Sequence, residues 1–203
     1  MSTASLRWLL DDGAHAAPDV FAAGPDAPAA VLAAMTGEGL LVPALPGVWL
    51  AADAAASPAA RCRALTRLAP ARGVVAGGAA LWARGLLATC PRVDVVLPPG
   101  AAGGSRSTPD GVRLRGLALG PGDVEALSGL ALTTPARTAA DVARWCPDGE
   151  QAAVAWVAAV LRAGCAAEQV RAALEVSARS PGVRRARRVL AVAAQSCRLP
   201  VIR

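Results

Sequence analysis

A strand-to-helix junction near residue 134 constrains the fold of this chain more than any other stretch. The apolar run Leu130–Leu132 predicts a short strand, and Thr134 and Pro135 follow it closely. Threonine is a favoured N-cap residue because its side-chain oxygen accepts a backbone N–H of the first turn. Proline fits the first helical position, where its missing N–H would have no partner in any case. The chain is therefore expected to change from strand to helix here.

The helix that begins at Pro135 carries three residues that helix initiation does not explain. Arg137, Thr138 and Asp141 follow within two turns. Arg137 and Asp141 are four residues apart, so they share a helix face and could form an ion pair. Residues 135–145 are thus expected to be a helix with a specific polar face.

The charge is distributed unevenly along the chain. Its 203 residues carry a net charge of +6 with a pI near 10.2, and every basic residue is Arg. Residues 1–60 have a net charge of −5, residues 61–170 of +4 and residues 171–203 of +7. The positive end is compatible with an anionic partner. The acidic residues 1–60 are not compatible with such a partner.

The first 53 residues show the element order of a winged helix-turn-helix. Helices are predicted at residues 6–13 and 26–37, with a short turn or helix at 18–24 between them, and a hairpin at 39–50. Asp26 is expected to cap the helix at 26–37. A recognition helix of this kind normally presents basic or amide side chains to DNA. The third helix has neither, which favours a degenerate or protein-facing module over a working DNA-binding face.

Residues 51–58 form an Ala-, Asp- and Ser-rich linker, which predicts a boundary between a domain at 1–53 and one at 58–203. The second domain is expected to hold a small sheet in a helical frame with a helical C-terminus, so the fold class is α+β. Strands are predicted at 93–97, 112–117 and 130–132. Helices are predicted at 59–68, 73–88, 135–145, 148–163, 167–178 and 181–194, with a helical turn at 121–124.

No sequence signature of catalysis or metal binding is evident. The five cysteines are widely spaced and predict free thiols in a reducing compartment, and the single histidine, His15, is expected to be solvated. Residues 73–78 lack the Lys and Ser/Thr of a phosphate loop, so Gly77 and Gly78 are expected to allow close packing. Asp94 is expected to be a polar strand residue. The prediction is a protein that is not an enzyme and has no cofactor or metal.

Four arginines form the most basic feature, and they fall on one face of the last predicted helix. An amphipathic helix of this kind fits two interpretations equally well: a docking surface for nucleic-acid phosphates or an acidic protein, or a solvated face whose stems cover apolar neighbours. The candidate nucleic-acid contacts are Arg184, Arg185, Arg187 and Arg188.

The N-terminus lacks the pattern of a signal peptide, and the Ala-rich stretches are interrupted before they reach membrane-spanning length. No membrane association is therefore expected, and the predicted location is the cytoplasm.

Several segments resemble the AbiEi-like type IV antitoxin family of actinobacteria. The stretch at 133–144 is similar to the family's TTPARTLLDLAR-type signature, which assigns Thr134, Pro135, Arg137, Thr138 and Asp141 to the family motif. Looser similarities follow the family order at residues 74–86, 93–98, 111–115 and 180–188.

The resemblance implies a winged helix that represses its own operon and a C-terminal domain that opposes a nucleotidyltransferase toxin. It implies no catalysis by this chain. Many relatives continue into a restriction-endonuclease-like domain, which is expected to be missing because this chain ends at Arg203.

The leading hypothesis is a non-enzymatic, antitoxin-like transcription regulator. Operator DNA is its possible partner, and a nucleotidyltransferase toxin is its possible functional partner. Two alternatives remain: a protein-interaction module without DNA binding, and a relic of a nuclease-bearing ancestor.

Overall fold

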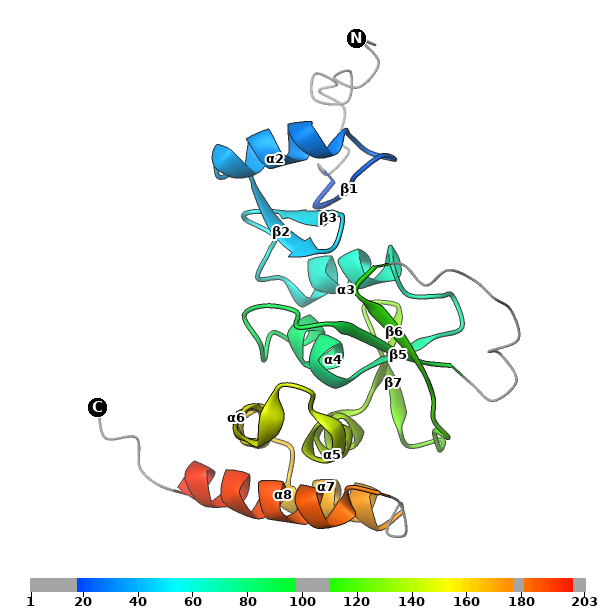
Figure 1. The fold of residues 1–203 in the computed structure, drawn as a ribbon, viewed down its shortest axis with the longest axis vertical. Helices are drawn as coiled ribbons and strands as arrows, with labels where there is room; N and C mark the ends of the chain where they lie inside the picture. The colour runs from blue at the N-terminus through cyan, green and yellow to red at the C-terminus, as the bar shows by residue number, and fades with distance from the viewer. Residues whose placement is uncertain (1–17, 98–109, 177–180, 199–203) are drawn as a thin grey trace.

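The computed structural model describes residues 18–97, 110–176 and 181–198, and these form a mixed α+β fold (Figure 1). Two small sheets lie one after the other along the molecule, and a group of helices covers the far end of the second sheet. The predicted α+β class and the helical C-terminus are confirmed. The predicted helix at 6–13 and His15 lie outside the described residues.

The first sheet is antiparallel and has the order β1-β3-β2. Its strands are β1 (Val20–Ala22), β2 (Leu41–Leu45) and β3 (Val48–Ala51). The predicted hairpin is therefore confirmed, and Gly47 in its turn has the positive φ of +70° that glycine adopts without strain.

Two predictions for this region are wrong. Residues 20–22 form β1 and not the predicted turn or helix, because Val20 and Phe21 pair with β3, a contact that local sequence does not reveal. Helix α2 (Ala29–Gly37) has Pro28 at its N-cap position without a side-chain cap. Asp26 instead accepts a hydrogen bond from the Ala22 backbone N–H at 2.7 Å, so it stabilises the turn before the helix.

The second sheet has the order β6-β5-β4-β8-β7. Its strands are β4 (Val74–Ala76), β5 (Val93–Leu97), β6 (Val112–Gly116), β7 (Val124–Leu127) and β8 (Leu130–Thr133). The pairs β5–β6 and β4–β8 are parallel, and β4–β5 and β7–β8 are antiparallel. The predicted strands β5, β6 and β8 are confirmed.

The predictions for residues 73–88 and 121–124 need correction. Residues 74–76 form β4, between β5 and β8, and only then does the short helix α4 (Gly77–Ala83) begin. Val124 starts β7 after a tight turn. Residues 74–76 pair with β5 and β8, which lie far along the chain, and β7 pairs with β8 in a hairpin; in both cases strand pairing overrode the local helical pattern.

The other helices match their predicted positions. They are α3 (Pro58–Thr66), α5 (Pro135–Trp145), α6 (Gly149–Arg162), α7 (Ala167–Glu175) and α8 (Val183–Arg198). Val157, Leu174 and Leu190 join the apolar cluster that holds α5 to α8 together. None of the helices in the described ranges combines the length and apolarity needed to cross a bilayer.

A separate apolar cluster includes residues on both sides of the predicted domain boundary. Val48 and Leu50 of the first sheet belong to the same cluster as Leu65 of α3 and Val95 of β5. The boundary at 53–58 stays a prediction, and the apolar packing is continuous across it.

Candidate functional site

The junction between β8 and α5 contains the family-motif residues. Pro135 occupies the predicted position at the start of α5, and Thr134 lies at the N-cap. The predicted capping bond is wrong, because the Thr134 side chain makes no cap hydrogen bond. Its hydroxyl lies 3.4 Å from the Gly122 carbonyl, and its backbone N–H donates to the Asp123 carbonyl at 2.9 Å. Thr134 therefore ties the helix start to the turn before β7.

Arg137 forms the predicted pair with Asp141, and the pair is buried. Arg137 Nε lies 2.9 Å from Asp141 Oδ2, and Arg137 Nη1 lies 2.6 Å from Asp123 Oδ2. The residues Arg137 and Asp141 are only 7% and 6% exposed. Burial raises the pKa of the Asp141 carboxyl above its usual value, although Arg137 acts in the opposite direction. One guanidinium thus joins α5 to the turn before β7.

Thr138 completes this junction. Its hydroxyl donates to the Thr133 carbonyl at 3.0 Å and lies 2.7 Å from the Thr133 hydroxyl. Both residues are fully buried. The polar residues of the motif therefore connect the end of β8 to the first turns of α5, a role that stabilises the fold.

Helix α8 presents the four candidate nucleic-acid contacts, and they differ in environment. Arg185 donates to the Arg144 and Cys146 carbonyls at 3.2 and 3.4 Å, so it satisfies the C-terminal end of α5. Arg184 is exposed and has no ion pair within the described ranges.

The remaining two form exposed ion pairs. Arg187 lies 2.7 Å from Glu175 of α7, and Arg188 makes two hydrogen bonds of 2.8 and 2.6 Å to Glu150 of α6. Arg184, Arg187 and Arg188 are therefore exposed on α8, while half-buried Arg185 is bonded to the end of α5.

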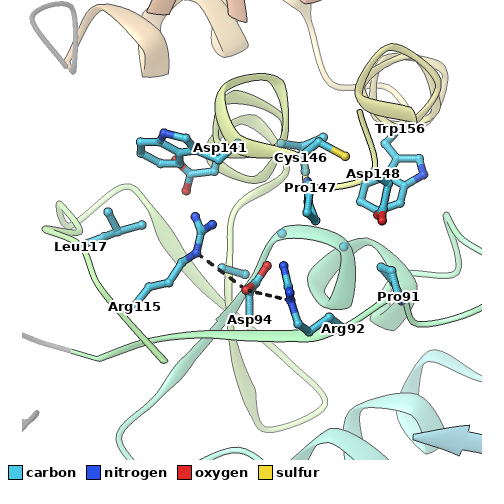
Figure 2. Close-up of a pocket in the computed structure, with 15 residues that line it drawn as sticks. Pro91, Arg92, Asp94, Arg115, Leu117, Asp141, Cys146, Pro147, Asp148 and Trp156 are labelled. Carbon is cyan, nitrogen blue, oxygen red and sulfur yellow. Dashed lines mark ion pairs between the residues drawn. The ribbon is translucent and has the colours of Figure 1, made fainter. Parts of the chain in front are cut away.

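A pocket of about 160 Å³ lies between the second sheet and the α5–α6 corner (Figure 2). Arg92 and Arg115 reach Asp94 from opposite sides, and the end of Arg115 points toward Asp141. The lining residues come from the β4–α4 corner, β5 and the segment before it, β6 and the residue after it, α5, the α5–α6 loop and α6. They are Ala76, Gly77, Gly78, Pro91, Arg92, Asp94, Arg115, Leu117, Asp141, Val142, Trp145, Cys146, Pro147, Asp148 and Trp156.

Asp94 lies in β5, as predicted, but it is only 8% exposed and three guanidinium groups surround it. Its Oδ1 lies 2.6 Å from Nε of Arg113, 3.7 Å from Nε of Arg115 and 3.9 Å from Nε of Arg92. One carboxylate thus faces three positive charges. Burial lowers the pKa of Arg115, with smaller contributions from Arg113 and Arg92, although the negative charges of Asp94 and Asp141 act in the opposite direction.

The sequence did not predict this cluster, because β6 turns Arg113 and Arg115, and not its apolar residues alone, toward neighbouring elements. The alternation at 112–116 predicted a half-buried strand, which usually turns its apolar residues inward. Leu114 is 39% exposed instead, while Arg113 and Arg115 are partly buried against Asp94. The two alternating arginines next to a strand carrying an aspartate were the available signal.

The predicted role of the glycine pair is confirmed at Gly78. A Cβ at Gly78 would lie 2.5 Å from Pro91 Cγ and 3.0 Å from a ring carbon of Trp156. Glycine is therefore needed here for α6 to approach α4. The close approach also places Pro91 and Trp156 in the pocket wall.

The cysteines are free, as predicted, and no group of ligating side chains in the described ranges could hold a metal ion. Cys90 precedes the pocket wall at Pro91. Burial, and secondarily the negative charge of Asp94, raises the pKa of the Cys90 thiol to about 12. Its thiol is thus protonated at neutral pH.

No model of a protein family matches the sequence, and no curated protein matches it. The family resemblance therefore depends on the motifs alone, and function has to be argued from the site.

Proposed function

We propose that this chain is a non-enzymatic, antitoxin-like transcription regulator of a type IV toxin–antitoxin system. It acts in the cytoplasm, binds the operator of its own gene and opposes a nucleotidyltransferase toxin. The observation that carries the proposal is the arginine row of α8, defined as Arg184, Arg187 and Arg188. These side chains are exposed, while the opposite face of α8 packs on the helical core.

The ion pairs of the arginine row do not prevent phosphate binding. Arg187 and Glu175 are 54% and 52% exposed, and Arg188 and Glu150 are 62% and 43% exposed. Exposed pairs of this kind contribute little to stability, since water screens them. A DNA phosphate can therefore replace either carboxylate at small cost, and Arg184 has no such pair to give up.

The N-terminal elements are compatible with a winged helix, but they lack the basic surface that such a domain normally presents to DNA. The sheet order β1-β3-β2 and the position of α2 before the β2–β3 hairpin are compatible with a winged helix. Helix α2 carries no basic residue, so the proposed DNA contacts lie on α8 and not on α2.

DNA binding can be measured by fluorescence anisotropy with the DNA upstream of the gene and with scrambled DNA, each at two salt concentrations. The test variant changes Arg184, Arg187 and Arg188 to Ala. Arg185 is retained, because its contacts with α5 are structural. Exposed Arg162 of α6, changed to Ala, is the matched control for one lost charge.

We expect tighter binding to the upstream DNA, binding that weakens with salt, and a salt slope that falls by about one unit for each arginine removed. The Arg162→Ala variant should leave the salt slope unchanged. Equal binding to both DNAs, or no loss in the triple variant, would contradict the proposal.

A protein-interaction module is the second candidate, and the surface of α2 and β2 favours it. Val31, Leu40 and Val42 are 47%, 57% and 41% exposed. Exposed large apolar side chains can mark contacts with proteins. Leu40→Glu would then abolish protection from a co-expressed toxin, and the wild-type chain would show no preference for the upstream DNA.

A further inference from the structure

We infer that α8 enters the major groove of the operator DNA and that its C-terminal half contacts base edges there, with Gln195 as the specificity-determining residue. The inference rests on the proposed function and extends it, because contacts between arginine and phosphate position a protein on DNA but do not select a sequence. The base-reading surface of α8 is defined as Ala191, Val192 and Gln195.

Helix α8 is placed so that a groove can receive it. It lies along one edge of the molecule, at the end remote from the first sheet (Figure 1). Its 16 residues form a rod about 24 Å long. An α-helix with its side chains is about 10–12 Å across, and the major groove of B-DNA is about 12 Å wide and 8.5 Å deep, so one helix fits into it.

Six exposed side chains form a continuous stripe on the side of α8 that faces away from the helical core. They are Arg184, Arg187, Arg188, Ala191, Val192 and Gln195. Helical spacing places all six within an arc of about 140°. The opposite side of α8 carries Val189, Leu190 and Ala193, which are buried in the core. The sequence of α8 contains no acidic residue, so nothing on the helix itself repels DNA.

The two halves of this stripe differ in chemistry. The arginine row occupies the N-terminal half, where the positive end of the helix dipole adds to the attraction for phosphates. The C-terminal half carries the uncharged base-reading surface. A glutamine side chain can bond both N6 and N7 of adenine, and small apolar side chains contact the methyl group of thymine. The stripe therefore matches a partner with anionic rims and an A·T pair exposed between them, which is the major groove of DNA.

The position of Gln195 fits this role. It is seven residues beyond Arg188, a distance of about 10 Å along the helix, which is comparable with the width and depth of the major groove. Its side chain is exposed and makes no hydrogen bond within the described part of the chain. The Gln169 side chain, in contrast, accepts a bond from the Ala166 N–H at 2.9 Å. The amide of Gln195 is thus available to a base.

The test measures fluorescence anisotropy of variants with the upstream DNA and with scrambled DNA. Gln195→Ala should lower the preference for the upstream DNA about tenfold and leave the salt slope unchanged. Arg187→Ala should weaken binding to both DNAs alike and lower the slope by about one unit. Gln151→Ala removes the same side chain from the exposed surface of α6, and this matched control should change neither quantity.

These measurements separate the inference from the proposed function. An unchanged preference in Gln195→Ala, with the effect of Arg187→Ala intact, would overturn the inference and leave the proposed function standing. An equal loss of affinity for both DNAs in Gln195→Ala would also overturn it, since the side chain would then not distinguish bases. A wild-type chain without preference for the upstream DNA would overturn both. Circular dichroism would establish that each variant keeps its helical content.

A modified base locates the contact in the groove. 7-Deazaadenine lacks the N7 acceptor, which adenine presents in the major groove. Upstream DNA that contains 7-deazaadenine in place of adenine should bind the wild-type chain about tenfold more weakly. The Gln195→Ala variant should bind the modified and unmodified DNA equally. The same loss in both proteins would contradict a bond between Gln195 and adenine, and tighter binding of polyglutamate than of either DNA would indicate an acidic protein as the partner and overturn the inference.

Discussion

Two regions of this molecule use arginine in opposite ways. In the buried junction at α5, Arg137 has a side chain only 8% exposed and contacts two carboxylates. On the surface of α8, Arg187 has a side chain 54% exposed and contacts one. The same residue type therefore fixes the fold in one place and leaves a charge available to a partner in the other.

The difference follows from solvation. A buried ion pair has lost the water around both charges, so removal of one partner leaves the other uncompensated in a low-dielectric setting. An exposed pair keeps most of its water, and salt screens it. The first kind of arginine cannot exchange its partner at small cost, and the second can.

The largest effect is expected at the buried junction. Arg137→Met should lower the free energy of unfolding by about 3–5 kcal/mol, because it leaves Asp141 buried and unpaired. Urea denaturation followed by circular dichroism would measure the loss. Arg187→Met on α8 is the control and should change stability very little. A loss as small as that of the control would break the comparison.

The partner of Arg137 allows a sharper version of this experiment. The double variant Arg137→Met with Asp141→Leu should be more stable than Arg137→Met alone, since the second change removes the uncompensated charge. If both variants are equally unstable under urea, the loss came from packing and not from the buried charge.

Packing at the pocket should give the next effect. Gly78→Ala should cost about 1–3 kcal/mol, because the added Cβ would overlap Pro91 and approach Trp156. Gly122→Ala is the matched control, since a Cβ there meets nothing within 4 Å. Thermal unfolding of both variants would separate them, and equal midpoints would show that the junction is looser than its contacts indicate.

A smaller effect should distinguish two neighbouring arginines on α8. Arg185→Ala should cost about 1 kcal/mol, because it removes two hydrogen bonds to the last carbonyls of α5. Arg184→Ala should not change the urea midpoint measurably. Equal losses would show that the two hydrogen bonds from Arg185 to the end of α5 do not stabilise the fold.

The smallest change concerns reactivity and not stability. With a pKa of about 12, Cys90 should stay protonated at pH 8 and react slowly with iodoacetamide. Peptide mapping after timed labelling would measure the rate, and labelling in urea provides the reference for an accessible thiol. Labelling of the folded chain as fast as in urea would contradict the burial of this cysteine.

The helices were the most predictable part of the fold, and short strands the least. Pro135, Gly164 and Gly182 mark the breaks of the last four helices, and each acts within its own turn. Strands β1 and β4 were missed because each has three residues and depends on partners far along the chain. Local patterns cannot reveal such pairing.

The candidate sites also have one part that the sequence predicted and one part that it could not predict. The sequence placed Arg137 and Asp141 on one face of α5, and it placed the arginines of α8 on one face of that helix. Helical spacing alone determines which residues share a face. It did not reveal that Asp123 joins the first pair or that Arg185 turns inward, because those contacts come from other elements.

By itself, the sequence determined most of the helices and the strand-to-helix change at Pro135, because both depend on residues close together in the chain. It also determined the uneven distribution of charge, which follows directly from the residue types. Only the tertiary structure decided that β6 turns its arginines toward Asp94. It also formed the pocket that Arg115 lines. The physical reason is that the inward face of a strand is chosen by what packs on the sheet, and α5 and α6 lie distant from β6 in the chain.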